Sequence, residues 1–570
     1  MERIQGQVAA QVELAKHVLF WITCALRPLT TVELQHALAV EVGEQELDKE
    51  NLPDLEDMVS SCAGLVTVEE QSDIIRLVHY TTQEYFKRTQ DHWFPNAETA
   101  ITEVCITYLS FDSFANGRCE STDEYEERLR LNPFYAYAAI YWGHHARHTS
   151  TLDQEILDFL QCKAKVEAAS QAVIPGQRHS HSANHHQCVP GLHLAAWFGL
   201  EREVKTFLLH PEVEVGARDG YGWTPLMWAA RGNNYSVVKL LLDTGNSDPS
   251  AQNDNGVTAF WLAVIGNHEA IAKLLLHESP LDVAPQPLFP VVKRNLFGMV
   301  KLLLDSGKVN PDVTDTCGRA PLFYAAMKGY HAIAKLLLDT YNASADPKCN
   351  FGRTPLSIAA EKGHQTIINL LLATDKVDVD SRDNAKRTPL WYAAQEGHEA
   401  VLTTLLCFEC VDPDPKDYYG FTALSVAVRH QRTAAVKRLL NTGRVDIASH
   451  DLFGKTPLWY ARKLANAGII RLLLEHSWET GLSVSQDDLP TSVAPDWPFG
   501  TPRYGNPRYG NPRYGYTRHA TCDVCTRKIT REEIYYSCEV CNDADYDICV
   551  DCYEMGARCL DPGHQCIIGR

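Results

Sequence analysis

The stretch Thr388-Pro-Leu-Trp-Tyr-Ala-Ala394 carries the pattern that decides the fold of this 570-residue chain. A threonine and a proline open a helix, and the two alanines are small enough for a second helix to pack closely. The pattern recurs every 34 residues, except for one interval of 28 residues. The marker positions are Pro190, Thr224, Thr258, Gln286, Ala320, Thr354, Thr388, Thr422 and Thr456. A fixed period of this length indicates stacked copies of one supersecondary unit.

Each copy contains the signals for two helices and a turn. The threonine hydroxyl can accept a hydrogen bond from an unpaired amide, and proline has no amide hydrogen to leave unpaired. Glycines such as Gly329, Gly363 and Gly397 end the first helix. Leu370–Leu372 marks a second helix, and Asn255-Gly256 marks a turn. One copy cannot bury its leucines alone, so its stability requires stacking.

The copies resemble ankyrin repeats, because Thr224-Pro-Leu-Met-Trp-Ala-Ala and the stretch at Thr388 match that family's helix-opening motif. The resemblance implies a mainly α chain with an α-solenoid of about nine repeats over residues 189–478. It also implies that hairpin tips and first helices recognise other proteins. Aromatic residues at the tips are candidate anchors, or structural residues if they pack between hairpins. They are Tyr221, Trp223, Phe351, Tyr418, Tyr419, Phe421 and Phe453.

Composition excludes several functional classes. A net charge of −19 argues against nucleic-acid binding, which depends on neutralising phosphates. No apolar run reaches the ~18 residues of a membrane helix, and the N-terminus lacks a signal peptide. Eight of the 18 cysteines lie in the last 49 residues, which indicates a metal site and not a disulfide framework. We expect an intracellular protein, cytoplasmic rather than nuclear, that binds proteins but neither nucleic acid nor membranes.

Residues 1–95 predict a small winged-helix-like domain. Ala15–Leu26 predicts an apolar helix, and Thr30-Thr-Val-Glu33 is a capping box that opens a second helix. Leu65–Val68 and Ile74–His79 predict a β-hairpin. Residues 1–100 contain seven basic and seventeen acidic residues, which argues against the DNA binding common in this fold.

This segment resembles the winged-helix region that follows the NACHT module in fungal NACHT/STAND immune-receptor-like proteins. Leu29–Val40 and Leu77–Phe86 carry the resemblance. The NACHT module itself is missing, because no Gly-x4-Gly-Lys-Ser/Thr loop occurs in the sequence. We expect either a relative that lacks this module or part of a longer gene product.

Two segments predict connections between domains. Residues 96–188 predict a helical connector with a surface cluster of His144, His145 and His148, followed by a polar histidine-rich linker. Residues 479–517 contain Pro502-Arg-Tyr-Gly505 and two further copies of this motif. Proline and glycine at this density favour a flexible tether.

Residues 518–570 contain the only constellation with definite metal chemistry. Three Cys-x2-Cys pairs and the pair Cys559-x4-His564 supply eight ligands, enough for two tetrahedral zinc ions. A segment of about 50 residues buries too little apolar surface to fold unaided, so zinc would supply its stability. With four protein ligands on each ion, both sites would be structural.

The segment resembles a ZZ-type zinc finger through Asp545-Tyr-Asp-Ile-Cys549-x2-Cys552-Tyr553 and Tyr536-Ser-Cys538. The resemblance implies crossed pairing of the ligands. One ion would take Cys522, Cys525, Cys549 and Cys552, and the other Cys538, Cys541, Cys559 and His564. Cys559 departs from the family's usual histidine, and Cys566 is the alternative ligand. It further implies that nearby carboxylates bind a basic peptide or a peptide N-terminus, unless they only solvate the finger. They are Asp543, Asp545, Asp547 and Asp551.

These features together predict a non-enzymatic scaffold or signalling adaptor. The repeats would bind one protein partner and the zinc finger would bind a peptide. The alternatives are a ubiquitin ligase that uses the terminal finger, and the detached sensor arm of a nucleotide-driven immune switch.

Overall fold

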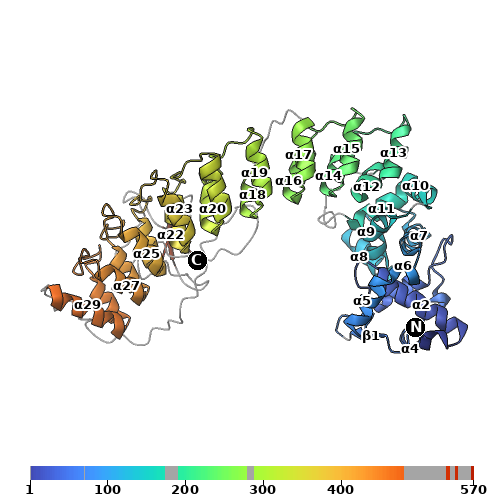
Figure 1. The fold of residues 1–570 in the computed structure, drawn as a ribbon, viewed down its shortest axis with the longest axis horizontal. Coiled ribbons are helices and arrows are strands. Elements are labelled where there is room, and N and C mark those ends of the chain that lie inside the picture. Colours follow the sequence, from blue (N-terminus) through green and yellow to red (C-terminus); the bar gives the residue numbers. More distant parts are fainter. Residues whose placement is uncertain are drawn as a thin grey trace. The chain divides into compact units, whose positions relative to one another are not determined.

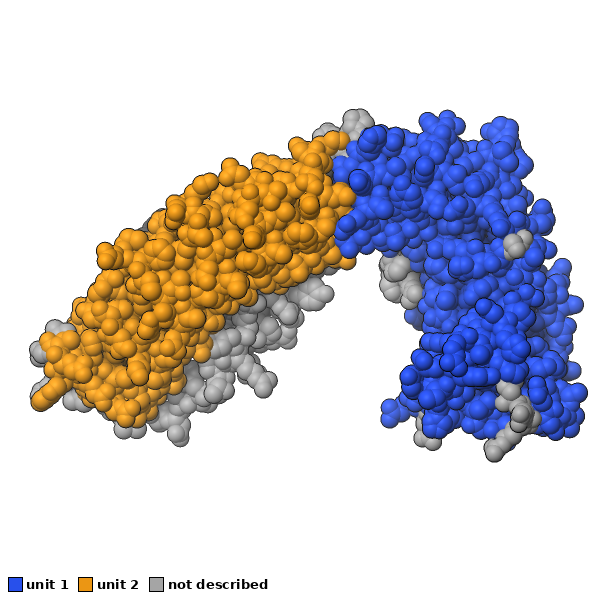
Figure 2. All heavy atoms as spheres, in the orientation of Figure 1, with its two compact units in different colours: residues 1–282 blue, residues 283–570 orange. Residues whose placement is uncertain are grey.

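The computed structural model describes residues 2–69, 71–149, 151–173, 190–278, 288–480, 535–538, 546–549 and 567–569. The chain forms two compact units, residues 1–282 and residues 283–570 (Figure 2). The division falls beside Gln286, where the repeat interval shortens to 28 residues.

The N-terminal part of the first unit combines short helices with a two-stranded hairpin. Its elements are α1 (Glu2–Gln5), α2 (Ala9–Cys24), α3 (Thr31–Leu38), η1 (Lys49–Asn51), α4 (Leu55–Ser61), β1 (Val66–Glu69), β2 (Ile74–Leu77) and α5 (Tyr80–Arg88). The capping box is confirmed, since Thr30 Oγ1 accepts from the Glu33 amide at 3.2 Å and Glu33 Oε2 accepts from the Thr30 amide at 2.9 Å. The hairpin is also confirmed, with Val66 opposite Leu77. The predicted start of the first helix at Ala15 was wrong, because the good helix formers before it extend α2 back to Ala9.

A helical connector follows within the same unit. It comprises α6 (Gln90–Trp93), α7 (Ala97–Leu109), η2 (Asp112–Phe114), α8 (Thr122–Leu131), α9 (Tyr135–Ala146), α10 (Asp153–Gln161) and α11 (Lys163–Val173). The predicted surface cluster of histidines was wrong for His145, which is fully buried. Its ring nitrogens lie 3.0 Å from Tyr137 Oη and 2.6 Å from Glu98 Oε2 on α7. The prediction relied on the closeness of His144, His145 and His148 in sequence. That closeness gave no sign that the His145 ring contacts Tyr137 on α9 and Glu98 on α7.

The repeats form pairs of antiparallel helices in both units (Figure 1). The first unit contains α12 (Gly191–Phe198), α13 (Glu201–Leu209), α14 (Pro225–Arg231), α15 (Tyr235–Asp243), α16 (Ala259–Gly266) and α17 (Glu269–Glu278). The second contains α18 (Leu288–Lys293), α19 (Phe297–Asp305), α20 (Pro321–Lys328), α21 (His331–Lys335) with the π-helical η4 (Leu336–Thr340), α22 (Pro355–Lys362), α23 (Gln365–Leu372), α24 (Pro389–Glu396), α25 (Glu399–Leu406), α26 (Ala423–Arg429), α27 (Thr433–Leu440), α28 (Pro457–Lys463) and α29 (Ala467–Thr480).

Within each unit, first helices pack on first helices and second helices on second helices. The alanine pairs permit this approach, because Ala359, Ala360, Ala393 and Ala394 have no exposed surface. The middle residue of each leucine triplet points into the core, and Leu371 is one of these fully buried residues. The helix period explains why its two neighbours are more exposed.

The predicted helix ends are confirmed. Six marker threonines accept a hydrogen bond from the amide three residues later: Thr224, Thr258, Thr354, Thr388, Thr422 and Thr456. Gly329, Gly363 and Gly397 adopt left-handed conformations at the helix C-termini, which other residues adopt at a cost. Ala320 has the same extended conformation as the threonines but no side-chain cap.

Three short strands are described beyond the repeats. They are β3 (Tyr535–Cys538), β4 (Tyr546–Cys549) and β5 (Ile567–Gly569), and β3 pairs antiparallel with both others. The predicted class is therefore confirmed as mainly helical with repeats. No helix in the described ranges combines the length and apolarity needed to cross a membrane.

Candidate protein-binding surface

A carboxylate holds five of the described hairpin turns between successive helix pairs. Asp383 Oδ1 accepts hydrogen bonds from the amides of Ala385 and Arg387, both at 2.9 Å. The same two bonds recur at the equivalent repeat positions Asp219, Asp315, Asp417 and Asp451, and an amide oxygen makes them at Asn253. These bonds satisfy backbone donors that would otherwise be unpaired at the turn.

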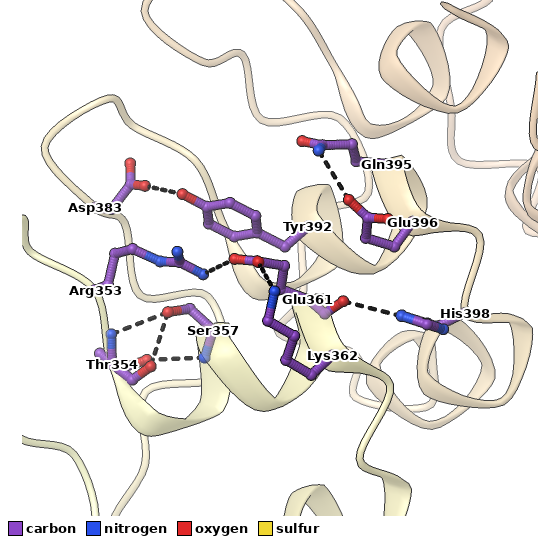
Figure 3. Close-up of polar contacts among 10 residues, drawn as sticks. All are labelled: Arg353, Thr354, Ser357, Glu361, Lys362, Asp383, Tyr392, Gln395, Glu396 and His398. Carbon is purple, nitrogen blue, oxygen red and sulfur yellow. Dashed lines mark hydrogen bonds and ion pairs between the residues drawn. The ribbon is translucent and has the colours of Figure 1, made fainter. Parts of the chain in front are cut away.

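The second oxygen of these carboxylates binds an aromatic side chain nine residues later, on the following first helix. Tyr392 Oη donates to Asp383 Oδ2 at 2.5 Å (Figure 3). Trp228, Tyr324 and Tyr460 donate in the same way, at 3.0, 2.6 and 2.6 Å. The bond therefore fixes each turn against the helix that it precedes, and these aromatic residues are structural.

Asp417 is the exception, because Val426 occupies the aromatic position. Its side chain is only 1% exposed, and the closest cation, Arg387 Nε, lies 3.9 Å from Oδ2. Burial raises the pKa of Asp417 to about 6. The cost of burying a charge explains this direction, because burial disfavours the ionised carboxylate.

A second polar network joins two neighbouring first helices in the second unit. Arg353 forms an ion pair with Glu361, and Lys362 Nζ lies 2.5 Å from the other Glu361 oxygen (Figure 3). Burial favours a higher pKa for Glu361, but the two cations lower it overall. The Arg353 guanidinium also lies 4.2 Å from the centre of the Tyr392 ring. This contact ties α22 to α24 through a cation and an aromatic ring.

Basic residues recur at the ends of the first helices in the second unit. They are Lys293 on α18, Lys328 on α20, Lys362 on α22, Arg429 on α26, and Arg462 and Lys463 on α28. We name these six residues the basic row. The six first helices of this unit contain only two acidic residues, Glu361 and Glu396.

Comparison with known proteins agrees with this geometry. A family model described as ankyrin repeats matches three times, over residues 192–285, 288–383 and 375–451. These units are ankyrin repeats. A second model, described as the winged helix domain of GPI inositol-deacylase, matches residues 1–102, so the N-terminal winged helix is also confirmed.

Curated relatives match only parts of the chain. Calmodulin-binding transcription activator 4 of Arabidopsis thaliana is 30% identical over 135 residues, which is 23% of this chain and 13% of the relative. An ankyrin repeat protein of Rickettsia bellii is 40% identical over 65 residues, 11% of this chain and 38% of the relative. Tyrosine-protein kinase Shark of Drosophila melanogaster is 36% identical over 90 residues, 16% of this chain and 10% of the relative. The chain thus spans well under half of each relative's length.

The predicted fingertip aromatics of the ankyrin repeats have two kinds of environment. Tyr419 and Phe421 are 3% and 1% exposed and pack between neighbouring hairpins, with Phe453 stacked 6.4 Å from Tyr419. Tyr419 and Phe421 are therefore not surface anchors, because the stack covers them. The half-buried candidates are Tyr221, Trp223, Phe351, Tyr418 and Phe453.

The predicted zinc and peptide sites lie almost entirely outside the described residues. Of the ligands, only the backbones of Cys538 and Cys549 are described, in β3 and β4. Of the acidic residues, only the backbone of Asp547 is described, and it also lies in β4. The other predicted ligands and acidic residues lie outside the described residues, and so does the alternative ligand Cys566. They are Cys522, Cys525, Cys541, Cys552, Cys559, His564, Asp543, Asp545 and Asp551. The described residues contain no cluster of metal-binding side chains.

Sequence analysis overlooked the histidine of the first repeat. His193 follows Leu192 in Pro190-Gly-Leu-His193, the position where the ankyrin motif has a histidine. The side chain is fully buried, and its Nε2 lies 3.0 Å from the Trp223 carbonyl oxygen in the next turn. Burial lowers the pKa of His193 to about 4. Alignment of all nine markers would have revealed this residue.

Sequence analysis also overlooked a ladder of aspartates. Asp312, Asp346, Asp380 and Asp414 are spaced by 34 residues, and each accepts from a backbone amide 32 residues later. Burial raises the pKa of Asp346, Asp380 and Asp414, for Asp414 to about 6. We name these four residues the aspartate ladder. Each rung joins one repeat to the next.

Proposed function

We propose that this chain is a non-enzymatic scaffold or signalling adaptor. The ankyrin repeats carry this proposal, since their buried side chains hold the stack while the hairpin tips and first helices remain available for partners. Structural aromatics and carboxylates repeat in step at the turns, whereas the half-buried tip residues differ from repeat to repeat. Such variation on a repeated frame suits recognition of a particular protein surface.

Partner recognition can be tested through the fingertip aromatics. Partners captured by the full chain would be purified, and their affinities measured for wild type and for a variant with Tyr221→Ser, Phe351→Ser and Tyr418→Ser. We expect at least about a tenfold loss of affinity, since aromatic anchors dominate many interfaces. Tyr235→Ser on α15 is the control, because this side chain is 46% exposed but lies on a second helix. Equal affinities for all three proteins, or turnover of a substrate by the chain, would refute the proposal.

We further propose that residues 518–570 form a ZZ-type finger with two structural zinc ions. The donor set fits, because seven cysteines and one histidine complete two tetrahedral sites. The strand register supports only the assignment of Cys538 and Cys549 to different ions. Cys538 is opposite Tyr546 and Cys549 is opposite Tyr535, three residue pairs apart. Along the strands that backbone separation is about 10 Å, which favours two separate ions.

The finger would bind a peptide with a free or basic N-terminus through Asp543, Asp545, Asp547 and Asp551. Their negative charge near the third cysteine pair supports this ligand chemistry. Calorimetry with the zinc-loaded full chain would compare one peptide with a free amino group and the same peptide after acetylation. We expect acetylation to weaken binding at least about tenfold, through loss of a charged hydrogen bond. Equal, weak binding of both forms would refute this ligand.

A further inference from the structure

The basic row differs in charge from the rest of the chain. The whole chain has a net charge of −19, yet the first helices of the second unit contain six basic residues and only two acidic ones. Because these helices pack in sequence, their C-terminal turns lie beside one another, and five of the six carry a basic residue, whereas α24 ends in Glu396. Basic residues near helix C-termini also interact favourably with the helix dipole, which accounts for part of their placement but not for their surplus.

Aromatic rings accompany these cations. Lys293 Nζ lies 4.4 Å from the centre of the Tyr324 ring, and Lys463 Nζ lies 5.0 Å from that of Trp459. Arg429 lies 4.3 Å from the Phe421 ring centre. These rings hold the cations at defined places while leaving their charge in place.

Several cations lie near the end of α26. Burial and the nearby cations Arg429, Arg432 and Arg387 lower the pKa of His430. Glu396 and Asp417 face this group, with Arg432 3.7 Å from Glu396 and Arg387 3.9 Å from Asp417. Three guanidinium groups therefore surround His430 opposite two carboxylates.

Acidic residues collect elsewhere in the repeat. The aspartate ladder and its neighbours Asp378, Asp412 and Asp446 lie in the loops that follow the second helices. These carboxylates are bound to backbone amides of the stack, so they are part of its internal structure. The first helices differ from these loops, because the loops contain both acidic and basic residues whereas basic residues outnumber acidic ones on the first helices.

We propose that the basic row is the docking site for an acidic, extended segment of a protein partner. This inference rests on the proposed scaffold function and names the chemistry of its partner. Charge complementarity favours a polyacidic peptide, and the half-buried Trp459 beside Lys463 can contact its apolar atoms. Nucleic acid is the less favoured anion, because the acidic remainder of the chain repels a long polyanion.

The test uses a labelled peptide of about 20 residues in which Asp or Glu alternates with Ser and Gly. Fluorescence anisotropy would measure its binding to the full chain at low and physiological salt. One variant combines Lys293→Glu, Lys328→Glu and Lys463→Glu, all exposed residues of the basic row. The matched control combines Lys301→Glu, Lys335→Glu and Lys437→Glu, which are exposed on second helices and change the net charge equally.

We expect the basic-row variant to bind the acidic peptide at least about tenfold more weakly than the control variant, and salt to weaken binding by wild type. The circular dichroism of both variants should match wild type. Equal losses in the two variants would overturn the proposal in favour of bulk charge, and absence of peptide binding would overturn it directly. Tighter, row-dependent binding of an oligonucleotide of similar charge would overturn it in favour of nucleic acid. A partner that depends on the fingertip aromatics would leave the scaffold function standing in each case.

Discussion

Individual carboxylates determine how each repeat is joined internally. The bond between Tyr392 Oη and Asp383 Oδ2 is buried beside a turn that the same carboxylate already holds. Tyr392→Phe removes the donor but leaves the carboxylate in place. We expect the free energy of unfolding to fall by about 1–3 kcal/mol, the cost of a buried polar group without its partner.

Chemical denaturation would measure this change. Tyr330→Phe is the control, because its hydroxyl lies at the exposed surface 3.4 Å from the Lys293 carbonyl oxygen. A smaller effect for Tyr392→Phe than for Tyr330→Phe would contradict a structural role for the aspartate–aromatic bond.

Three carboxylates of the aspartate ladder are partly buried, and burial disfavours their ionised form at neutral pH. The pKa of Asp414 is about 6 in the folded chain, above the ordinary value of 3.8. A raised folded-state pKa contributes stability below pH 3.8 that is lost as pH rises through 6. Asp414→Asn should therefore stabilise the second unit at pH 7 by about 1 kcal/mol, after allowance for partial exposure, and should make no comparable difference near pH 4.

Hydrogen exchange followed by mass spectrometry would report the stability of residues 400–446 at both pH values. Asp339→Asn provides the comparison, because this carboxylate is exposed on a second helix. If both substitutions stabilise equally, net charge and not burial is the cause.

At the scale of the helix, the marker threonines show how strongly local sequence determines structure. Six of them cap a first helix, whereas Ala320 occupies the same position and extended backbone without a hydroxyl. Ala320→Thr should add the missing cap bond to the Phe323 amide and stabilise α20 by about 1 kcal/mol.

Thermal unfolding of the full chain would show this gain as a higher midpoint for the transition of the second unit. Ala320→Val adds similar volume without an oxygen and should stabilise less. A gain from valine that equals the gain from threonine would indicate packing and not capping.

Helix ends, turns and the repeat period could be predicted because each depends on residues a few positions apart. Thr30 and Glu33 form their capping box within four residues, and the glycines end helices through their own backbone conformation. The buried partners of His145 could not be predicted, because Glu98 is 47 residues away. The aspartate ladder was detectable only by applying the 34-residue period to polar residues as well as to apolar ones. The basic row required knowing which helices share a layer.

At the scale of the whole molecule, the two units should respond differently to mild acid. His193 in the first unit has a pKa of about 4, below the ordinary 6.5. Its contribution to the stability of that unit is therefore present above pH 6.5 and is lost as pH falls toward 4. Its loss amounts to about 3 kcal/mol. In the second unit, Asp414 and Asp417 contribute more stability over that range and the lowered pKa of His430 opposes them, so the net change should be smaller.

Limited proteolysis at pH 7 and pH 5 would separate these responses. We expect faster cleavage within residues 190–278 at pH 5, and a smaller change within residues 400–446. His193→Gln keeps a side-chain hydrogen-bonding group but does not titrate, so it should flatten the response of the first unit alone. An equally large increase in cleavage of the two segments in wild type would contradict this assignment.

Zinc should affect only the C-terminal finger. A chelator should unfold residues 518–570, because zinc supplies most of that segment's folding energy, and should leave the ankyrin repeats folded. Proteolysis would detect the change as rapid cleavage after residue 517, with residues 190–480 resistant. A chelator that also destabilises the repeats, or leaves the finger intact, would contradict the proposed metal sites.

The aspartate ladder has a consequence for how such a chain can change in length. Each rung reaches an amide 32 residues further on, and a donor in the same position recurs in the next copy. If 34 residues were excised or duplicated, each remaining aspartate would therefore still meet an equivalent amide donor in the following repeat. Evolution and protein engineers alike could thus shorten or lengthen the second unit in whole copies, whereas any other increment would break a rung.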